Sequence, residues 1–131
     1  MRNPVGIAGL ALCMLGSVLV SPAFAGSATA AECDPPDCWG AIATSDSTHH
    51  WGYSYNDPSQ GVAEAAAMRE CDESDCAIRV SFADSCGAVA TSADWVAWGH
   101  ADTRAGAESE AMAACRGAGC HIQTWACTSR T

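Results

Sequence analysis

The chain has 131 residues, and its 15 acidic residues outnumber 6 basic ones, for a formal net charge of −9 at pH 7. Such a surface repels the phosphates of nucleic acids and the headgroups of anionic lipids, so we expect neither as a partner. The size favours one small domain, and the charge favours a basic protein or a component of the cell envelope as partner.

Residues 1–25 have the pattern of a cleaved secretory signal peptide. Arg2 supplies the positive start, residues 5–20 are apolar, and Ala23 and Ala25 frame an A-x-A cleavage site. The apolar run is short for a transmembrane helix and lacks a basic stop-transfer flank, so we expect no stable membrane insertion after cleavage. The mature chain is expected to be secreted, to the medium, the cell wall or the periplasm, and to begin with an N-terminal arm over 26–37.

Residues 38–127 are expected to form one duplicated domain, with a short tail over 128–131. A shift of 47 overlays the phrase starting at Gly40 on the phrase starting at Gly87, and Trp51 on Trp98. A shift of 44 overlays the segments that end at Cys71 and Cys115. A three-residue deletion reconciles the two registers, and we place it in the loop before the helix, because loops tolerate gaps. Copy one then spans 39–85 and copy two spans 86–127.

Each copy is predicted to fold as strand, turn, strand, helix, strand. In copy one, strands over 39–45 and 50–55 flank a polar turn. A helix over 60–71 follows, opened by Ser59 or by Asp57-Pro58. The third strand covers 76–83.

Copy two repeats this order, with a helix that starts from Asp102 or Thr103, ends near Cys115 and has Gly117 as its stop. The last strand covers 120–127. Two copies with one apolar face each predict an α+β fold of approximate twofold symmetry. We expect a mixed or antiparallel sheet of about six strands, covered by two helices.

Eight cysteines follow the signal segment, and an even count in a small exported chain indicates disulfides. Cysteines at equivalent places in the two copies are expected to pair within each copy, and "CDPPDC" forms a third local pair. The predicted bonds are Cys71–Cys76, Cys115–Cys120, Cys33–Cys38 and, by remainder, Cys86–Cys127. Structural zinc at the C-x4-C elements, with His121 beside Cys120, is the alternative, which an oxidising compartment disfavours. No cofactor is expected.

The aromatic residues of "WGYSY" allow two interpretations. Trp51, Tyr53 and Tyr55 are two residues apart and therefore share one face of a strand. They are expected either to fill the core or to form a binding stripe, because aromatic side chains are enriched in both settings.

The doubled phrase, with "WGAIATS", "WGYSY", "CGAVATS", the paired C-x4-C elements and a terminal "WAC", resembles a family of small exported bacterial domains. This is the family of domain of unknown function 4189, and the resemblance covers roughly 39–127. It implies a secreted domain with disulfides and carries no catalytic residues with it.

Two groups of histidines are candidates for chemistry. His49 and His50 lie near Asp46 and could bind a metal or act as an acid–base pair, and His100 lies two residues before Asp102. A solvated turn and a helix cap explain the same residues without catalysis. No nucleophile motif such as G-x-S-x-G is present, and the acidic loops "DPPD" and "DESD" lack the length of a calcium loop.

The sequence therefore favours a secreted, non-enzymatic binding domain that acts on a protein or an envelope component, as an effector or an inhibitor. The alternative is a small secreted hydrolase or metal-dependent enzyme that uses His49, His50 and His100 with nearby carboxylates. A third hypothesis is a purely structural protein of the cell wall.

Overall fold

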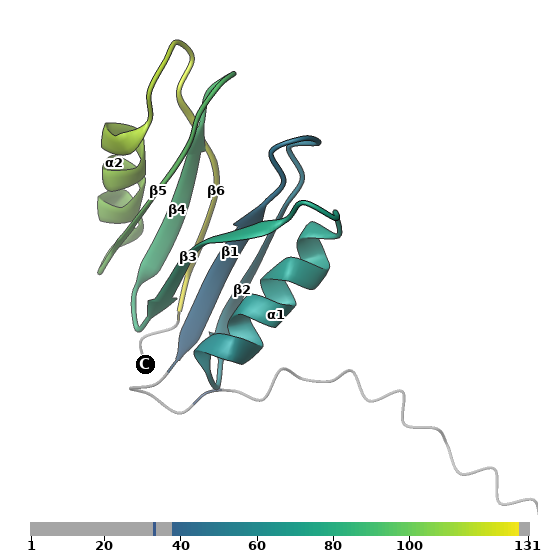
Figure 1. Cartoon of the computed structure of the whole chain (residues 1–131). Helices are drawn as coiled ribbons and strands as arrows, with labels where there is room; N and C mark the ends of the chain where they lie inside the picture. Colours follow the sequence, from purple (N-terminus) through teal and green to yellow (C-terminus); the bar gives the residue numbers. More distant parts are fainter. Residues whose placement is uncertain (1–32, 34–37, 129–131) are drawn as a thin grey trace, which may run out of the picture.

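A computed structural model describes Cys33 and residues 38–128. The predicted signal peptide over 1–25, the arm over 26–37 apart from Cys33, and residues 129–131 of the tail lie outside the described residues. Eight elements follow one another along the chain (Figure 1): β1 (Trp39–Thr44), β2 (Trp51–Asp57), α1 (Gln60–Cys71), β3 (Ala77–Ala83), β4 (Cys86–Thr91), β5 (Val96–Ala101), α2 (Arg104–Ala114) and β6 (His121–Cys127).

The predicted α+β class, the duplicated unit and the six strands are confirmed, but the strands form two sheets. The first sheet has the order β2-β1-β3 and the second has the order β5-β4-β6, and all neighbours are antiparallel. Each copy therefore closes its own sheet, because the central strand finds both of its hydrogen-bonding neighbours within the same copy. A single sheet would need strands from different copies to pair.

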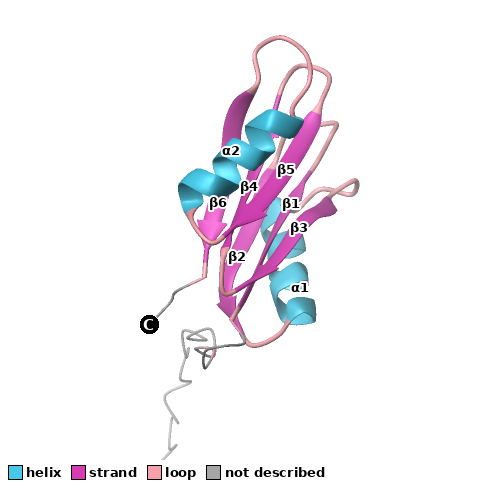
Figure 2. Ribbon diagram, turned by 90° about the vertical axis from the view of Figure 1, so that its left-hand side faces the viewer, coloured by secondary structure: helices cyan, strands magenta, loops and turns pink. Residues whose placement is uncertain are grey.

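The two sheets pack face to face, and each carries its helix on the outside. The layers run α1, first sheet, second sheet, α2 (Figure 1), and Figure 2 shows α2 across the face of the second sheet that is nearest the viewer. Across the middle, β2 lies against β6 and β3 lies against β5. This exchange of partners is what an approximate twofold axis between the copies requires.

Side-chain size separates the two faces of the central strands. In β1, Ala41 and Ala43 pack against alanines of α1, whereas Ile42 points into the layer between the sheets with Val80, Phe82 and Val89. Central strands that are buried on both faces have no polar alternation, in agreement with the sequences of β1 and β4. The large apolar side chains join the two copies, and the alanines let the helices approach closely.

Each helix begins at one of the two N-terminal residues or pairs expected from the sequence, and the side chain of that residue caps it. The Ser59 hydroxyl accepts the backbone N–H of Val62, and the Thr103 hydroxyl accepts that of Gly106. Helix α1 ends at Asp72, which has a left-handed backbone (φ 51°), and α2 ends before Gly117, where the chain turns with φ 91°.

All four predicted disulfides are present in the structure. They join Cys33–Cys38, Cys71–Cys76, Cys86–Cys127 and Cys115–Cys120. The two bonds that are matched between copies each fasten the end of a helix to the loop that leads into the next strand. Cys86 and Cys127 are directly opposite each other on β4 and β6, so their bond closes the second copy across its sheet.

The strand register corrects the predicted alignment of the two tryptophans. Tyr53 is opposite Ile42, and Trp98 is opposite Val89, which is the counterpart of Ile42 in the repeated phrase. Trp98 therefore corresponds to Tyr53, and Trp51 corresponds to Val96. The identical Trp-Gly pairs lie in different places of the two copies.

The deletion is split between a turn and a bulge, not confined to the loop before the helix. The turn of copy one closes with a bond from Ser45 N to His50 O, and that of copy two closes from Ser92 N to Trp95 O, which removes two residues. The third extra residue is in a bulge of β2 opposite the start of β1, where Asn56 has φ 57°. Two of the three deleted residues lie in the turn before the second strand of each copy, not after that strand. The residues of β2 and β5 are therefore matched with a shift of 45, and not 47, over most of their length.

Candidate functional site: an aromatic groove between the copies

Trp51, Tyr53 and Tyr55 form a row along β2, which we call the aromatic row. Gly52 and Ser54 turn toward α1, so the three rings point to the opposite face. Their centroids are 5.7 Å and 6.1 Å apart, with planes inclined by 23° and 18°. Tyr53 packs partly into the core, whereas Trp51 is 38% and Tyr55 is 52% exposed. Core filling explains only the middle ring, Tyr53, because Trp51 and Tyr55 are exposed to solvent.

The aromatic row forms one side of a groove with a volume of about 710 Å³, which we call the aromatic groove. Its other side is the last strand, where six consecutive residues, Ile122–Cys127, line it, and Arg104 and Glu108 of α2 close it. The groove thus joins β2 of copy one to β6 and α2 of copy two. Sequence reasoning did not predict it, because neither copy contains it alone.

The lining by β6 reveals which part of that strand faces the groove. Successive side chains of a strand point to opposite faces, so side chains alone would supply only every second residue. A run of six consecutive residues lines one groove when the edge of the strand is turned toward it. In the part of the chain that the structure describes, β6 pairs only with β4, on its other side. The aromatic groove is therefore bordered by a free β-sheet edge.

Trp125 and Arg104 build the wall beside that edge. The carbon at the centre of the Arg104 guanidinium lies 3.8 Å from the centre of the Trp125 ring, which is a cation–π contact. Nε of Arg104 also donates to Oε1 of Glu108 at 2.7 Å. Glu108 is one helical turn after Arg104, so the cation is held by a carboxylate of α2 and by a ring of β6.

A bulge in β6 ties the two copies together at the groove. Gln123 is the extra residue between the pairs formed by Thr124 and Ile122, and its amide nitrogen donates to the carbonyl of His49 at 2.9 Å. Its amide oxygen is buried and has no hydrogen-bond partner among the described residues. Arg79 is the matching extra residue in β3, but it binds Thr44 and Asp46 of its own copy.

A second groove, of about 470 Å³, lies against β5, and its lining matches that of the aromatic groove only at Val96, Trp98 and Arg79. Its lining includes Trp95, Trp98, His49 and Arg79. The counterparts of the aromatic row here are Val96, Trp98 and His100, so the continuous stack is absent. The corresponding strand of copy two therefore folds without three aromatic rings in a row.

The turn before β2 is held by an exposed carboxylate. Asp75 accepts bonds from the Ser45 hydroxyl at 2.6 Å and from the backbone N–H of Ser47 at 3.0 Å. The Ser45 bond and then the Ser47 bonds lower the pKa of Asp75 from 3.8 to about 2. The carboxylate is thus charged at neutral pH and fixes the turn that leads into Trp51.

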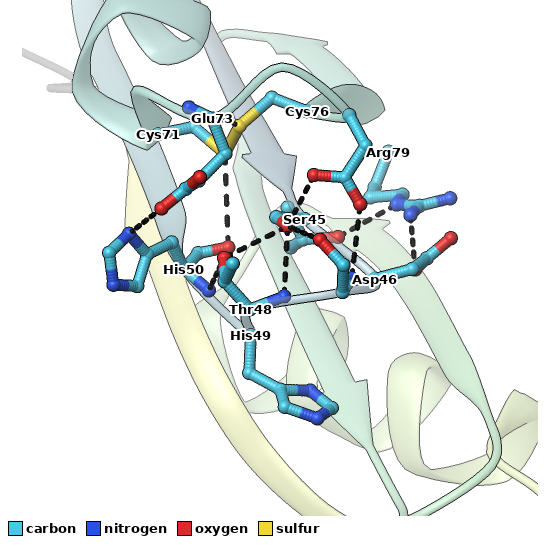
Figure 3. Close-up of a disulfide and its surroundings, with 12 residues drawn as sticks. Ser45, Asp46, Thr48, His49, His50, Cys71, Glu73, Cys76 and Arg79 are labelled. Carbon is cyan, nitrogen blue, oxygen red and sulfur yellow. Dashed lines mark hydrogen bonds and ion pairs between the residues drawn. A yellow bond between two sulfur atoms is a disulfide. The ribbon is translucent and has the colours of Figure 1, made fainter.

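The candidate histidines do not come together. His50 Nδ1 lies 2.8 Å from Glu73 Oε1, close to the Cys71–Cys76 bond, whereas the His49 ring points away from this cluster (Figure 3). His49 lines the second groove with Asp46. His100 is on β5 and lines neither groove. Its backbone N–H donates to the carboxylate of Glu110. The geometry assembles no acid–base set from these residues.

No membrane-spanning helix is found among the described residues, and no group of three or more His, Cys, Asp or Glu there is arranged to hold a metal ion. All eight cysteines after residue 25 form disulfides, so none is left as a thiolate for the zinc alternative. Four disulfides are typical of proteins that fold outside the reducing cytoplasm.

Comparison with known proteins agrees with the resemblance seen in the sequence. The family described as "Domain of unknown function (DUF4189)" matches residues 39–127. Protein Rv1269c of Mycobacterium tuberculosis (strain H37Rv) and Protein Mb1300c of Mycobacterium bovis are each 40% identical to the chain over 91 residues, which is 70% of this chain and 70% of each relative. No solved structure matches the chain significantly.

Proposed function

We propose that this chain, which belongs to the DUF4189 family, is a secreted, non-enzymatic domain that binds a protein or an envelope component in the aromatic groove. The signal pattern over residues 1–25 and the four disulfides support export. The net charge of −9 favours a basic partner. An effector and an inhibitor both act by such binding.

The observation that carries this proposal is that the aromatic row is exposed in the aromatic groove, whereas β5, the corresponding strand of copy two, has no such row. If the fold required three rings on this strand, the corresponding strand of copy two would need them as well. It has Val96 and His100 in place of Trp51 and Tyr55. The two exposed rings of the aromatic row are therefore not explained by packing, and exposed aromatic residues in a concave site are typical binding anchors.

The enzymatic alternative receives no comparable support. It needs His49, His50 and His100 to meet near carboxylates, and they lie in three separate settings. We therefore propose no reaction for this domain.

Capture from envelope extract tests the proposal. Wild-type protein, Tyr55→Ala and Trp98→Ala are immobilised at equal density and exposed to the same extract, after circular dichroism has shown that all three are folded. Both substitutions remove a half-exposed ring, but only Tyr55 lines the aromatic groove. We expect a partner that Tyr55→Ala loses and Trp98→Ala retains. Equal recovery by all three proteins would exclude the aromatic groove as the binding site.

A further inference from the structure

We infer that the occupant of the aromatic groove is an extended, basic segment of another protein that adds as a strand to the free edge of β6. This inference rests on the proposed function and names the chemical class of the partner. Its main chain would pair with β6, and its side chains would alternate between the aromatic row and solvent.

The free edge is the first observation that supports a polypeptide. The outer edge of a strand presents backbone N–H and C=O groups that only another strand satisfies in a regular way. Ile122–Cys127 all line the aromatic groove, and the bulge at Gln123 lies near the start of this edge. Six residues of strand measure about 20 Å, which is enough for a segment of similar length to pair along the groove. Arg104, which stacks on Trp125, and Glu108 line the groove beside this edge.

The orientation of the rings is the second observation. The planes of neighbouring rings in the aromatic row are within 23° of parallel, and the centroids follow one another at about the spacing of alternate residues. Neighbouring rings that are stacked have their faces turned toward one another, whereas a sugar chain packs on open ring faces. The row therefore suits the alternating side chains of a strand, which match its spacing, better than the pyranose rings of a glycan.

Charge is the third observation. Among the described residues that line the aromatic groove, the one arginine, Arg104, is paired with Glu108 at 2.7 Å and stacks on Trp125, so this lining carries no excess of positive charge. The surrounding molecule carries a net charge of −9. A segment with lysine or arginine at its solvent-facing positions would therefore be attracted from a distance by the net negative charge of the molecule.

Selection from a library of random peptides of about ten residues, displayed on phage, tests this inference while the natural partner is still unidentified. We expect enrichment of sequences in which apolar residues alternate with basic ones. Synthetic copies of the enriched peptides should bind wild-type protein and Trp98→Ala equally, and bind Tyr55→Ala about tenfold more weakly, as expected for loss of an anchor residue.

N-methylation separates pairing at the strand edge from simple hydrophobic contact. In an edge pairing, every second N–H of the peptide faces β6, so methylation of one alternate set should abolish binding and methylation of the other set should be tolerated. If both methylated peptides bind equally, or if no peptide is enriched, the inference is wrong.

A titration with glycans distinguishes failure of the strand-addition inference from failure of the proposed binding function. Chitin oligosaccharides and soluble peptidoglycan fragments are titrated into the same three proteins. Binding of a glycan that depends on Tyr55, with no enriched peptide, would overturn the strand-addition inference and leave the binding function standing. If no partner captured from envelope extract depends on Tyr55, the proposed function itself is wrong.

Discussion

The guanidinium of Arg104 lies 3.8 Å from the centre of the Trp125 ring and fixes one wall of the aromatic groove. We predict that Arg104→Ala lowers the free energy of unfolding by about 1 kcal/mol, because it removes both the cation–π contact and the ion pair with Glu108. Urea unfolding followed by circular dichroism measures the loss. Arg104→Lys should retain part of the stability, since an ammonium keeps the charge but not the planar contact.

Two variants separate the contributions at Arg104. Glu108→Gln removes the ion pair and leaves the ring contact, so it should cost less than Arg104→Ala. Arg116→Ala removes a guanidinium that lies 5.6 Å from the centre of the Trp95 ring, a weaker contact of the same kind. If Arg116→Ala and Arg104→Ala destabilise the protein equally, the close stacking on Trp125 has no special role in the wall.

The disulfides are predicted to differ in their contribution because they close loops of different length. Cys86–Cys127 has a sequence separation of 41, whereas Cys115–Cys120 has a separation of 5. In the chain-entropy estimate these bonds contribute about 4 and about 2 kcal/mol. Replacing both cysteines of each pair by serine should reproduce this order in urea unfolding. A larger loss from the Cys115–Cys120 pair would show that the bonds act on the folded state and not through the unfolded chain.

The local features of the fold could be read from the sequence. The caps at Ser59 and Thr103 and the matched cysteines are set by residues that are close in the chain. The division into two sheets was not predicted, because it depends on which distant strands pair, and the same alternation of residues suits one sheet or two. The identical Trp-Gly pairs suggested one continuous register, and only the strand pairing reveals that Trp51 and Trp98 do not correspond.

The aromatic groove was predictable only in part. The shared face of Trp51, Tyr53 and Tyr55 follows from strand alternation, and a binding stripe was one of its two interpretations. Its partners in the groove come from the other copy, and no pattern in the sequence places β6 beside β2. The bulge at Gln123 contributes to this contact, and it is not visible in a sequence without the register.

Gly52 is predicted to tolerate no side chain, because the helix lies directly against it. A Cβ at this position would lie 2.3 Å from the carbonyl oxygen of Ala67 and 2.3 Å from the backbone nitrogen of Cys71. Both are backbone atoms, so β2 and α1 would have to separate. Gly52→Ala should therefore destabilise the domain by about 1–3 kcal/mol in urea unfolding, the range for overpacking.

Gly61 provides the matched control for this substitution. It lies in the first turn of α1, where an added Cβ has no atom within 4 Å. Gly61→Ala should leave stability unchanged or raise it by up to about 1 kcal/mol, because alanine lowers the entropy of the unfolded chain and favours the helix. Comparable destabilisation by both substitutions would contradict the close packing of β2 against α1.

The turn before the aromatic row is predicted to loosen in acid through Asp75. Its pKa is depressed from 3.8 to about 2 by bonds that the Ser45 hydroxyl and the Ser47 N–H donate to the carboxylate. A depressed pKa means that the folded state favours the charged form, so the stabilisation is complete above pH 3.8 and is lost as the pH falls toward 2. Asp75→Asn should be less stable than wild type at pH 7, and the difference should shrink across this window. NMR titration of the Ser45 and Ser47 amides would follow the same step. If the two proteins lose stability in parallel between pH 4 and pH 2, another carboxylate controls the acid response and Asp75 does not fix the turn.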